Sequence, residues 1–210
     1  MRLAMPAEAR RIPLDDPVRA VKEYAGIIGA LRDAPRGAEA DLEALAAEAV
    51  EGVLREGALL MAVVTPAQAD PALLTGVVLL VPEGWDIGTA DAVRDSVEDV
   101  GGPDVRQTIL VASGVGPVVV AQRVPGVEQA RARQPLVAQL QGFVPEPGTG
   151  RMLLLTLSAP SVRGWAEHQA LFTELVASAG PSGSEQPPRV RRRSAQAPPD
   201  DSFEHHTYRL

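Results

Sequence analysis

The residues best suited to chemistry in this sequence are its three histidines and the serines close to one of them. A catalytic serine would need His168 as its base and Ser158 or Ser161 as the nucleophile, yet no Gly-x-Ser-x-Gly elbow occurs in the chain. A helical metal site would need a second ligand three or four residues after His168, and those positions hold Leu171 and Phe172. We therefore predict a structural or surface role for His168, and we interpret Ser161 as the cap of a helix.

The other motifs that resemble chemical sites also have simpler explanations. His205 and His206 lie in a C-terminal segment that we do not expect to hold a preorganised site. The glycine-containing segments 113–117 and 148–151 precede strand-like runs rather than helices, so they predict turns and not phosphate loops. Pairs of carboxylates fall at a helix start, on an exposed helix face and in the C-terminal segment, so we predict that these side chains are solvated and not catalytic. They are Asp15, Asp16, Asp95, Glu98, Asp99, Asp200 and Asp201. We assign no catalytic residue, metal ligand or cofactor.

The strongest local charge feature is an arginine run in the C-terminal segment, formed by Arg189, Arg191, Arg192 and Arg193. Such a run can bind an acidic partner, lipid head groups or nucleic acid. The net charge of −7 argues against a general nucleic-acid-binding protein, because binding to phosphates needs an extended basic face. These arginines remain candidate interaction residues.

Composition limits the class of protein further. Hydrophobic residues make up 45% of the chain but aromatic residues only 3%, which predicts a core of Val, Leu, Ile and Ala. No cysteine is present, so disulfides and thiolate chemistry are excluded. The sequence shows neither the apolar run of a signal peptide nor that of a membrane helix, so we predict a soluble, cytoplasmic protein. The use of arginine in place of lysine, with abundant Ala, Gly, Pro and Val, indicates a high-GC bacterial genome.

Apolar spacing predicts four helices. Asp16 and Pro17 supply an N-cap and a first-turn proline for the first of them. The second has an acidic face, and Gly57 is a natural stop for it. The third follows the first two strand-like runs. The fourth follows the last strand-like run and should close the core.

Short apolar runs predict about six strands at 58–64, 74–81, 105–112, 117–124, 136–144 and 152–157. The first two are close enough to pair antiparallel, and the turn at 113–116 predicts a hairpin between the next two. The run 136–144 alternates apolar and polar residues, so we expect it to be half exposed.

Together these elements predict an α+β fold with a curved antiparallel sheet of about six strands and helices packed on it. We expect a flexible leader at 1–14 and a single α+β domain at 15–179, helical over 15–56 and sheet-forming over 57–179. Residues 180–210 are rich in Pro, Ser and Arg, which predicts a disordered tail.

Two segments of the chain have a recognisable pattern: Leu-Leu-Val-Pro-Glu-Gly-Trp at 79–85, and the apolar strand at 153–157 that leads through Ser-Ala-Pro-Ser to a helix with Leu171 and Phe172. In these segments the chain resembles PsbP-like domains, in particular small actinobacterial proteins of the LpqN type. The resemblance covers about residues 57–179. It implies a curved antiparallel sheet with helices on its faces, and non-enzymatic protein binding or assembly. The chain lacks the signal peptide and lipobox cysteine of the lipoprotein members, and the resemblance transfers no binding residue.

Three functions remain open at this point. The leading hypothesis is a non-enzymatic binding or accessory protein whose partner is another protein. The second is a small-ligand-binding protein or enzyme that uses a pocket between sheet and helices, near Trp85, Arg123 or Trp165. The third is a self-associating structural component, with 136–144 as an exposed strand edge that pairs with a second copy.

Overall fold

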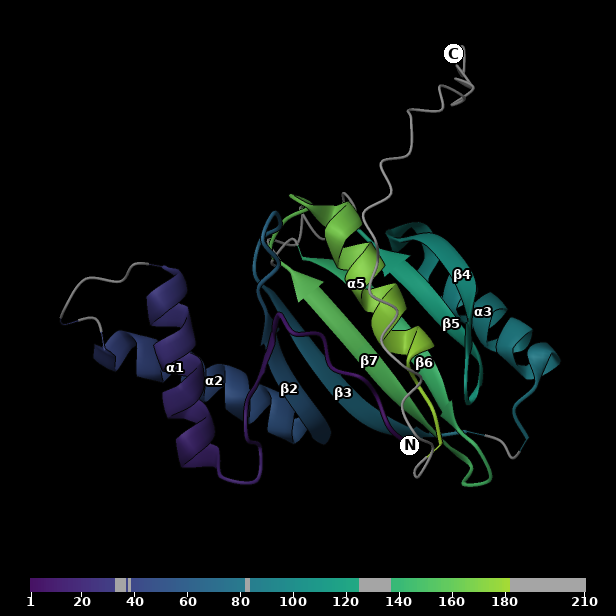
Figure 1. Cartoon of the computed structure of the whole chain (residues 1–210), viewed down its shortest axis with the longest axis horizontal. Coiled ribbons are helices and arrows are strands. Elements are labelled where there is room, and N and C mark those ends of the chain that lie inside the picture. Colours follow the sequence, from purple (N-terminus) through teal and green to yellow (C-terminus); the bar gives the residue numbers. More distant parts are fainter. Residues whose placement is uncertain (33–36, 38, 82–83, 125–136, 182–210) are drawn as a thin grey trace, which may run out of the picture.

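A seven-stranded antiparallel sheet lies at the centre of the computed structural model, with helices on both of its faces (Figure 1). The structure describes residues 1–32, 37, 39–81, 84–124 and 137–181. The strands are β1 (Ala9–Arg11), β2 (Ala58–Val64), β3 (Ala72–Leu80), β4 (Val105–Ser113), β5 (Gly116–Arg123), β6 (Ala138–Glu146) and β7 (Arg151–Ala159). The helices are α1 (Pro17–Leu31), α2 (Glu39–Arg55), α3 (Ile87–Gly101) and α5 (Trp165–Ala177), and a short 3₁₀ turn (Gly102–Asp104) follows α3. The predicted α+β class is confirmed.

The strands lie in the order β1-β2-β3-β7-β6-β5-β4. The predicted antiparallel pairing of the first long hairpin, β2 with β3, is confirmed, as is the β4–β5 hairpin that closes between Ser113 and Gly116. After β3 the chain runs through α3 to the far edge of the sheet, and β4 to β7 then return strand by strand until β7 pairs with β3. The sheet therefore consists of two parts that meet at the β3–β7 pairing.

Each face of the sheet has its own apolar core. On one face, Leu74, Leu157 and Leu140 are aligned across three strands and pack with α5. On the opposite face, α1 and α2 cover the β2 end through a cluster around Met61 and Val63. On that same opposite face, α3 covers the β5–β6 region through a separate cluster. The helices on this face thus lie over its two ends.

Helix α5 comes unusually close to the sheet at Gly142 in β6. A Cβ atom on Gly142 would lie 2.9 Å from Cγ1 of Val176 and 3.2 Å from the ring of Phe172. Both α5 side chains are fully buried. The absence of a side chain at residue 142 therefore sets the distance between helix and sheet.

We expect Gly142→Ala to lower the free energy of unfolding by about 1–3 kcal/mol, because the added methyl group overpacks the α5 interface. The matched control is Gly26→Ala in α1, where no atom lies within 4 Å of the added Cβ. That change should raise stability by about 0.5–1 kcal/mol, since alanine favours the helix. Urea unfolding of both variants measures the difference, and equal stabilities would contradict this account of the contact.

The prediction of a flexible leader at 1–14 is wrong, because part of this segment forms the additional strand β1. Arg10 pairs with Val63, and the backbone N–H of Ile12 donates to the carbonyl oxygen of Met61 at 2.8 Å. Ile12 is buried in the cluster beneath α1 and α2. Burial of Ile12, packing of Leu3, Met5 and Leu14 against the two cores, and the ladder bonds hold the segment in place.

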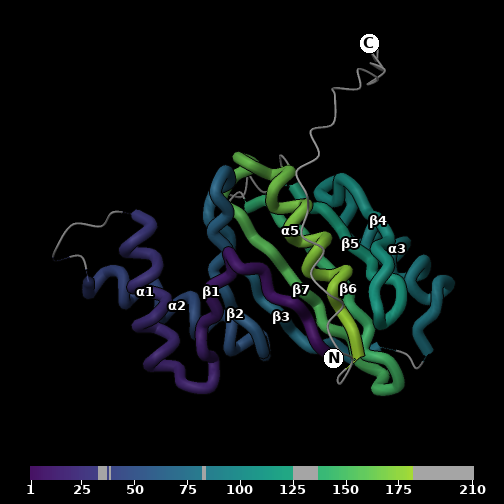
Figure 2. Tube along the Cα trace, viewed as in Figure 1, coloured from purple at the N-terminus to yellow at the C-terminus, as the bar shows by residue number. Residues whose placement is uncertain are grey.

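The predicted tail boundary at residue 180 also shifts slightly. The backbone groups of Gly180 and Arg2 exchange hydrogen bonds of 2.8 and 3.0 Å, so the N-terminus and the end of the described chain lie side by side (Figure 2). Residues 182–210 lie outside the described residues, and with them Arg189, Arg191, Arg192, Arg193, His205 and His206.

The strand predicted at 136–144 is not a sheet edge. It corresponds to β6, which pairs with β5 on one side and with β7 on the other. Its backbone groups are therefore used within the sheet and are not available to a second copy. Among the described helices, none is long and apolar enough to span a membrane.

Candidate functional site

Two neighbouring cavities lie at the end of the sheet where β3 and β6 finish and β7 begins. Their volumes are about 440 and 380 Å³, and both are lined by Glu146 and Arg151. We call the combined area the rim surface. The apolar walls of the first cavity are Val81, Trp85, Val115, Pro145 and Pro147. Those of the second include Leu3, Met5, Leu59, Leu60, Val78 and Leu153.

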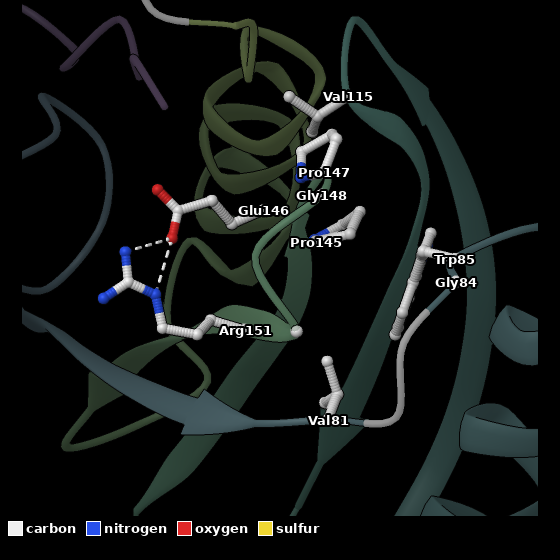
Figure 3. Close-up of a pocket in the computed structure, with 10 residues that line it drawn as sticks. Val81, Gly84, Trp85, Val115, Pro145, Glu146, Pro147, Gly148 and Arg151 are labelled. Atoms are coloured by element: carbon white, nitrogen blue, oxygen red, sulfur yellow. Dashed lines mark hydrogen bonds and ion pairs between the residues drawn. The ribbon is translucent and has the colours of Figure 1, made fainter.

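The indole ring of Trp85 is held in a fixed orientation. Its Nε1 donates a hydrogen bond of 2.8 Å to the carbonyl oxygen of Pro117. Gly116 adopts a φ of 115°, and a Cβ there would lie 3.5 Å from Cδ1 of the indole. Figure 3 shows the ring beside the same space as Pro145 and Val81. The first cavity thus offers a fixed aromatic ring flanked by proline.

The charges of Glu146 and Arg151 are satisfied within the rim surface. The two residues are opposite each other in the β6–β7 register, and Nε and Nη2 of Arg151 lie 3.0 and 2.9 Å from one carboxylate oxygen (Figure 3). Because both side chains are partly exposed, the pair adds little to stability. The N-terminal amine of Met1 lies 3.7 Å from the other oxygen of Glu146, and Arg11 also lines the second cavity, so the described charges of the rim surface are net positive.

Two leucines beside these cavities are largely exposed. Leu59, at the β2 bulge, is 65% exposed, and Leu80, which pairs with Arg151, is 85% exposed. Exposed aliphatic side chains next to apolar cavities are typical of surfaces that bind another molecule. No histidine, serine or threonine is among the described residues that line either cavity. The described lining therefore offers apolar contact area and a Glu146 carboxylate that pairs with both Arg151 and the N-terminal amine.

The histidine considered for catalysis lies elsewhere, at the start of α5. His168 is 0% exposed, and neither of its ring nitrogens has a hydrogen-bond partner among the described residues. The indole Nε1 of Trp165 is also buried without a partner, with the two ring centroids 5.8 Å apart. The described residues contain no group of three or more His, Asp or Glu side chains that could hold a metal ion.

We expect His168→Leu to leave the free energy of unfolding within about 1 kcal/mol of the parent value, because it removes two unsatisfied nitrogens at similar size. The comparison variant His168→Ala should lose about 2–4 kcal/mol through the cavity it creates. Chemical denaturation distinguishes the two. A leucine variant as unstable as the alanine variant would show that the imidazole makes a polar contact that matters.

The prediction that Ser161 caps the last helix is wrong. Helix α5 begins at Trp165 after Gly164, whose φ is 70° and whose hypothetical Cβ would lie 2.4 Å from Ala69. The close approach of the loop at Ala69 requires glycine there, so the chain makes one more turn before the helix. The hydroxyl of Ser161 instead donates to Asp70 at 2.5 Å and accepts from the backbone N–H of Arg163 at 3.0 Å.

Asp70 connects this turn to the loop that precedes β3. The guanidinium of Arg163 binds its carboxylate, with Nε at 2.7 Å, and this hydrogen bond is the main cause that lowers the pKa of Asp70 below its usual range. Ser161 lowers it further. A carboxyl group whose pKa is lower in the folded state stabilises the fold above its unfolded pKa and loses that effect as the pH falls.

We therefore expect Asp70→Asn to melt at a lower temperature than the parent at pH 7, with the difference shrinking as the pH falls below about 4. Exposed Asp15 provides the control, and Asp15→Asn should change the melting temperature much less. Thermal unfolding of the three proteins at pH 7 and pH 3 tests this. A gap between parent and Asp70→Asn that is as wide at pH 3 as at pH 7 would contradict the assignment.

The structure brings together only part of what the sequence suggested. Of the three residues considered for a pocket, Trp85 lines the rim surface, Trp165 packs against the core beneath α5, and Arg123 lies at the opposite end of β5. The sequence analysis did not identify Glu146 as a lining residue. It considered Arg151 only as part of the segment 148–151, which it interpreted as a turn and not as a phosphate loop. A signal was present, because charges of opposite sign flank the turn at 147–150.

Comparisons with protein-family models, with curated proteins and with solved structures found no match to this chain.

Proposed function

We propose that the protein is a non-enzymatic, cytoplasmic binding or accessory protein whose rim surface holds an extended, proline-containing segment of a polypeptide. The observation that carries the proposal is the fixed Trp85 ring between proline and aliphatic walls, beside the exposed leucines. The likeness to PsbP-like domains, with their habit of non-enzymatic binding, belongs to this proposal.

The geometry favours a polypeptide over a small molecule. The two cavities share Glu146 and Arg151, so a ligand that fills both must be extended. Proline-rich segments bind grooves lined by aromatic residues because their backbone loses little conformational freedom on binding. An internally paired centre and apolar walls suit a segment that contributes proline rings.

The chain itself contains a proline-containing segment directly after its described end in the sequence. The carbonyl oxygen of Ala179 accepts a hydrogen bond of 2.8 Å from the backbone N–H of Gly114, the neighbour of Val115 in the cavity wall. Pro187 and Pro188 follow only six and seven residues after Pro181, within a reach of about 20 Å. The described end of the chain is thus beside the rim surface.

The overall charge of the chain acts on this segment only at long range. Residues 180–210 contain five arginines and four carboxylates, so residues 1–179 carry the chain's net −7 and one further negative charge. The run from Arg189 to Arg193 is attracted to the acidic chain as a whole, while the contacts at the rim surface itself would come from the prolines of the segment. We propose residues 182–199 as the occupant of the rim surface, and a partner protein with a similar segment as its competitor.

We expect a fluorescent peptide of residues 182–199 to bind the chain that ends at Pro181, with saturation measured by anisotropy. Trp85→Ala should weaken binding at least about tenfold, because central aromatic contacts dominate such interfaces. Val100→Ala, at an exposed position in α3 outside the rim surface, is the control and should bind normally. A peptide with both Pro187 and Pro188 replaced by alanine should bind weakly.

Circular dichroism establishes that each protein is folded. Absence of saturable binding, or equal binding by Trp85→Ala, would contradict the proposal. Light scattering on the full-length chain then separates two ways of binding. A monomer means that the segment binds within its own chain, and a dimer that dissociates on deletion of 182–210 means that it binds a second copy.

A further inference from the structure

A third cavity, of about 450 Å³, lies between α1 and the sheet on the face opposite α5. It is formed by the second half of α1 and by the ends of β3 and β7 that are farthest from the rim surface. We call it the α1 cleft. Its apolar walls include Ile27, Ile28, Leu31, Val63, Leu73 and Val137.

Three polar side chains line this apolar cleft: Tyr24, Arg32 and Ser158. Within the described residues, neither hydroxyl makes a hydrogen bond and the guanidinium makes no ion pair. Burial raises the pKa of Tyr24, so its hydroxyl remains a neutral donor at physiological pH. Arg32 is close enough to oppose that shift, which places its positive charge near the phenol.

This arrangement contrasts with the rim surface. There the guanidinium of Arg151 is bound by Glu146, whereas the guanidinium of Arg32 has no carboxylate partner among the described residues. An apolar pocket with a few convergent polar groups is the usual form of a small-ligand site. A planar guanidinium pairs best with a carboxylate, and two neutral hydroxyls add donors without adding charge.

We propose that the α1 cleft binds a small amphipathic monoanion, a carboxylate with an aliphatic body of medium length. The aliphatic body packs between α1 and β3, against Ile28 and Leu73. The carboxylate lies at the cleft mouth, where it accepts hydrogen bonds from Arg32 and Tyr24. Among the described lining residues Arg32 supplies one positive charge, which matches a single negative charge on the ligand.

The position of Arg32 suits this role. It is the C-cap residue of α1, and its backbone N–H donates to the carbonyl oxygen of Ile28 at 3.0 Å. The negative end of the helix dipole attracts a guanidinium and so keeps it near the cleft. The same dipole repels the bound carboxylate, but this end of the helix is exposed, so solvent screens the repulsion. The direct hydrogen bond between the guanidinium of Arg32 and the carboxylate is charge-assisted and therefore stronger.

The test is calorimetric titration of the full-length protein with decanoate below its micelle concentration. We expect saturable one-to-one binding to the parent protein. Arg32→Gln keeps a polar side chain but removes the charge and the reach of the guanidinium, and it should weaken binding about tenfold or more. Tyr24→Phe should weaken binding by a smaller factor, and decanol, which has the same chain without the charge, should bind at least tenfold more weakly than decanoate.

Two control variants locate the site. Arg55→Gln removes an exposed α2 arginine that pairs with Glu51, and it should leave decanoate binding unchanged. Trp85→Ala should also leave it unchanged, because Trp85 lines the rim surface and not the α1 cleft. The proposal is overturned by absence of saturable binding, by equal affinities for decanoate and decanol, by full affinity in Arg32→Gln, or by loss of binding in Trp85→Ala.

Discussion

The pairing of β3 with β7 is the contact on which the rest of the structure depends. It joins the part of the sheet that carries α1 and α2 to the part formed by β4 to β7. Its register runs from Leu73 opposite Ser158 to Leu80 opposite Arg151. The first of these pairs contributes to the α1 cleft, and the second places the exposed Leu80 beside the ion pair of the rim surface. A slip of one residue would exchange the two faces of the strand, so both candidate sites require this register.

The elements themselves follow from local sequence, and for that reason they were predictable. Periodic apolar residues and the Asp16-Pro17 start indicate α1, and the structure shows the Asp16 carboxylate accepting from the backbone N–H of Arg19 at 3.1 Å. The hairpins β2–β3 and β4–β5 also follow from short-range signals, namely apolar runs separated by turns. The strand β1 did not, because three residues that include Arg10 and Arg11 have no apolar alternation of their own. Only the backbone of β2, far away in the sequence, makes this segment a strand.

The sites were less predictable because each combines residues that are distant in sequence. Trp85 could be singled out as a rare aromatic residue, but its partner Pro117 is reached only through the return of the chain after α3. At Ser161, a clear local signal led to a wrong prediction because a contact distant in sequence decides the structure. The local pattern of serine before an apolar helix favours a cap, whereas Ala69, far earlier in the sequence, comes so close to Gly164 that the helix starts later. Tertiary packing therefore overrides the local preference.

Charge pairing distinguishes the two ends of β7 in a way that their apolar content does not. Both cavities at its start and the cleft at its end are lined mainly by aliphatic side chains, so hydrophobic contact alone would let either bind many molecules. At the start of β7 the hairpin places Glu146 opposite Arg151, and a charged ligand would have to break that ion pair or bind beside it. At the other end the neighbour of Leu73 is Ser158, which is neutral, and the nearby charge is that of Arg32 alone among the described lining residues. Since an unpaired charge in an apolar setting gains most from a partner of opposite sign, the cleft suits the anion proposed for it, whereas the proposed ligand of the rim surface would bind there through its proline rings.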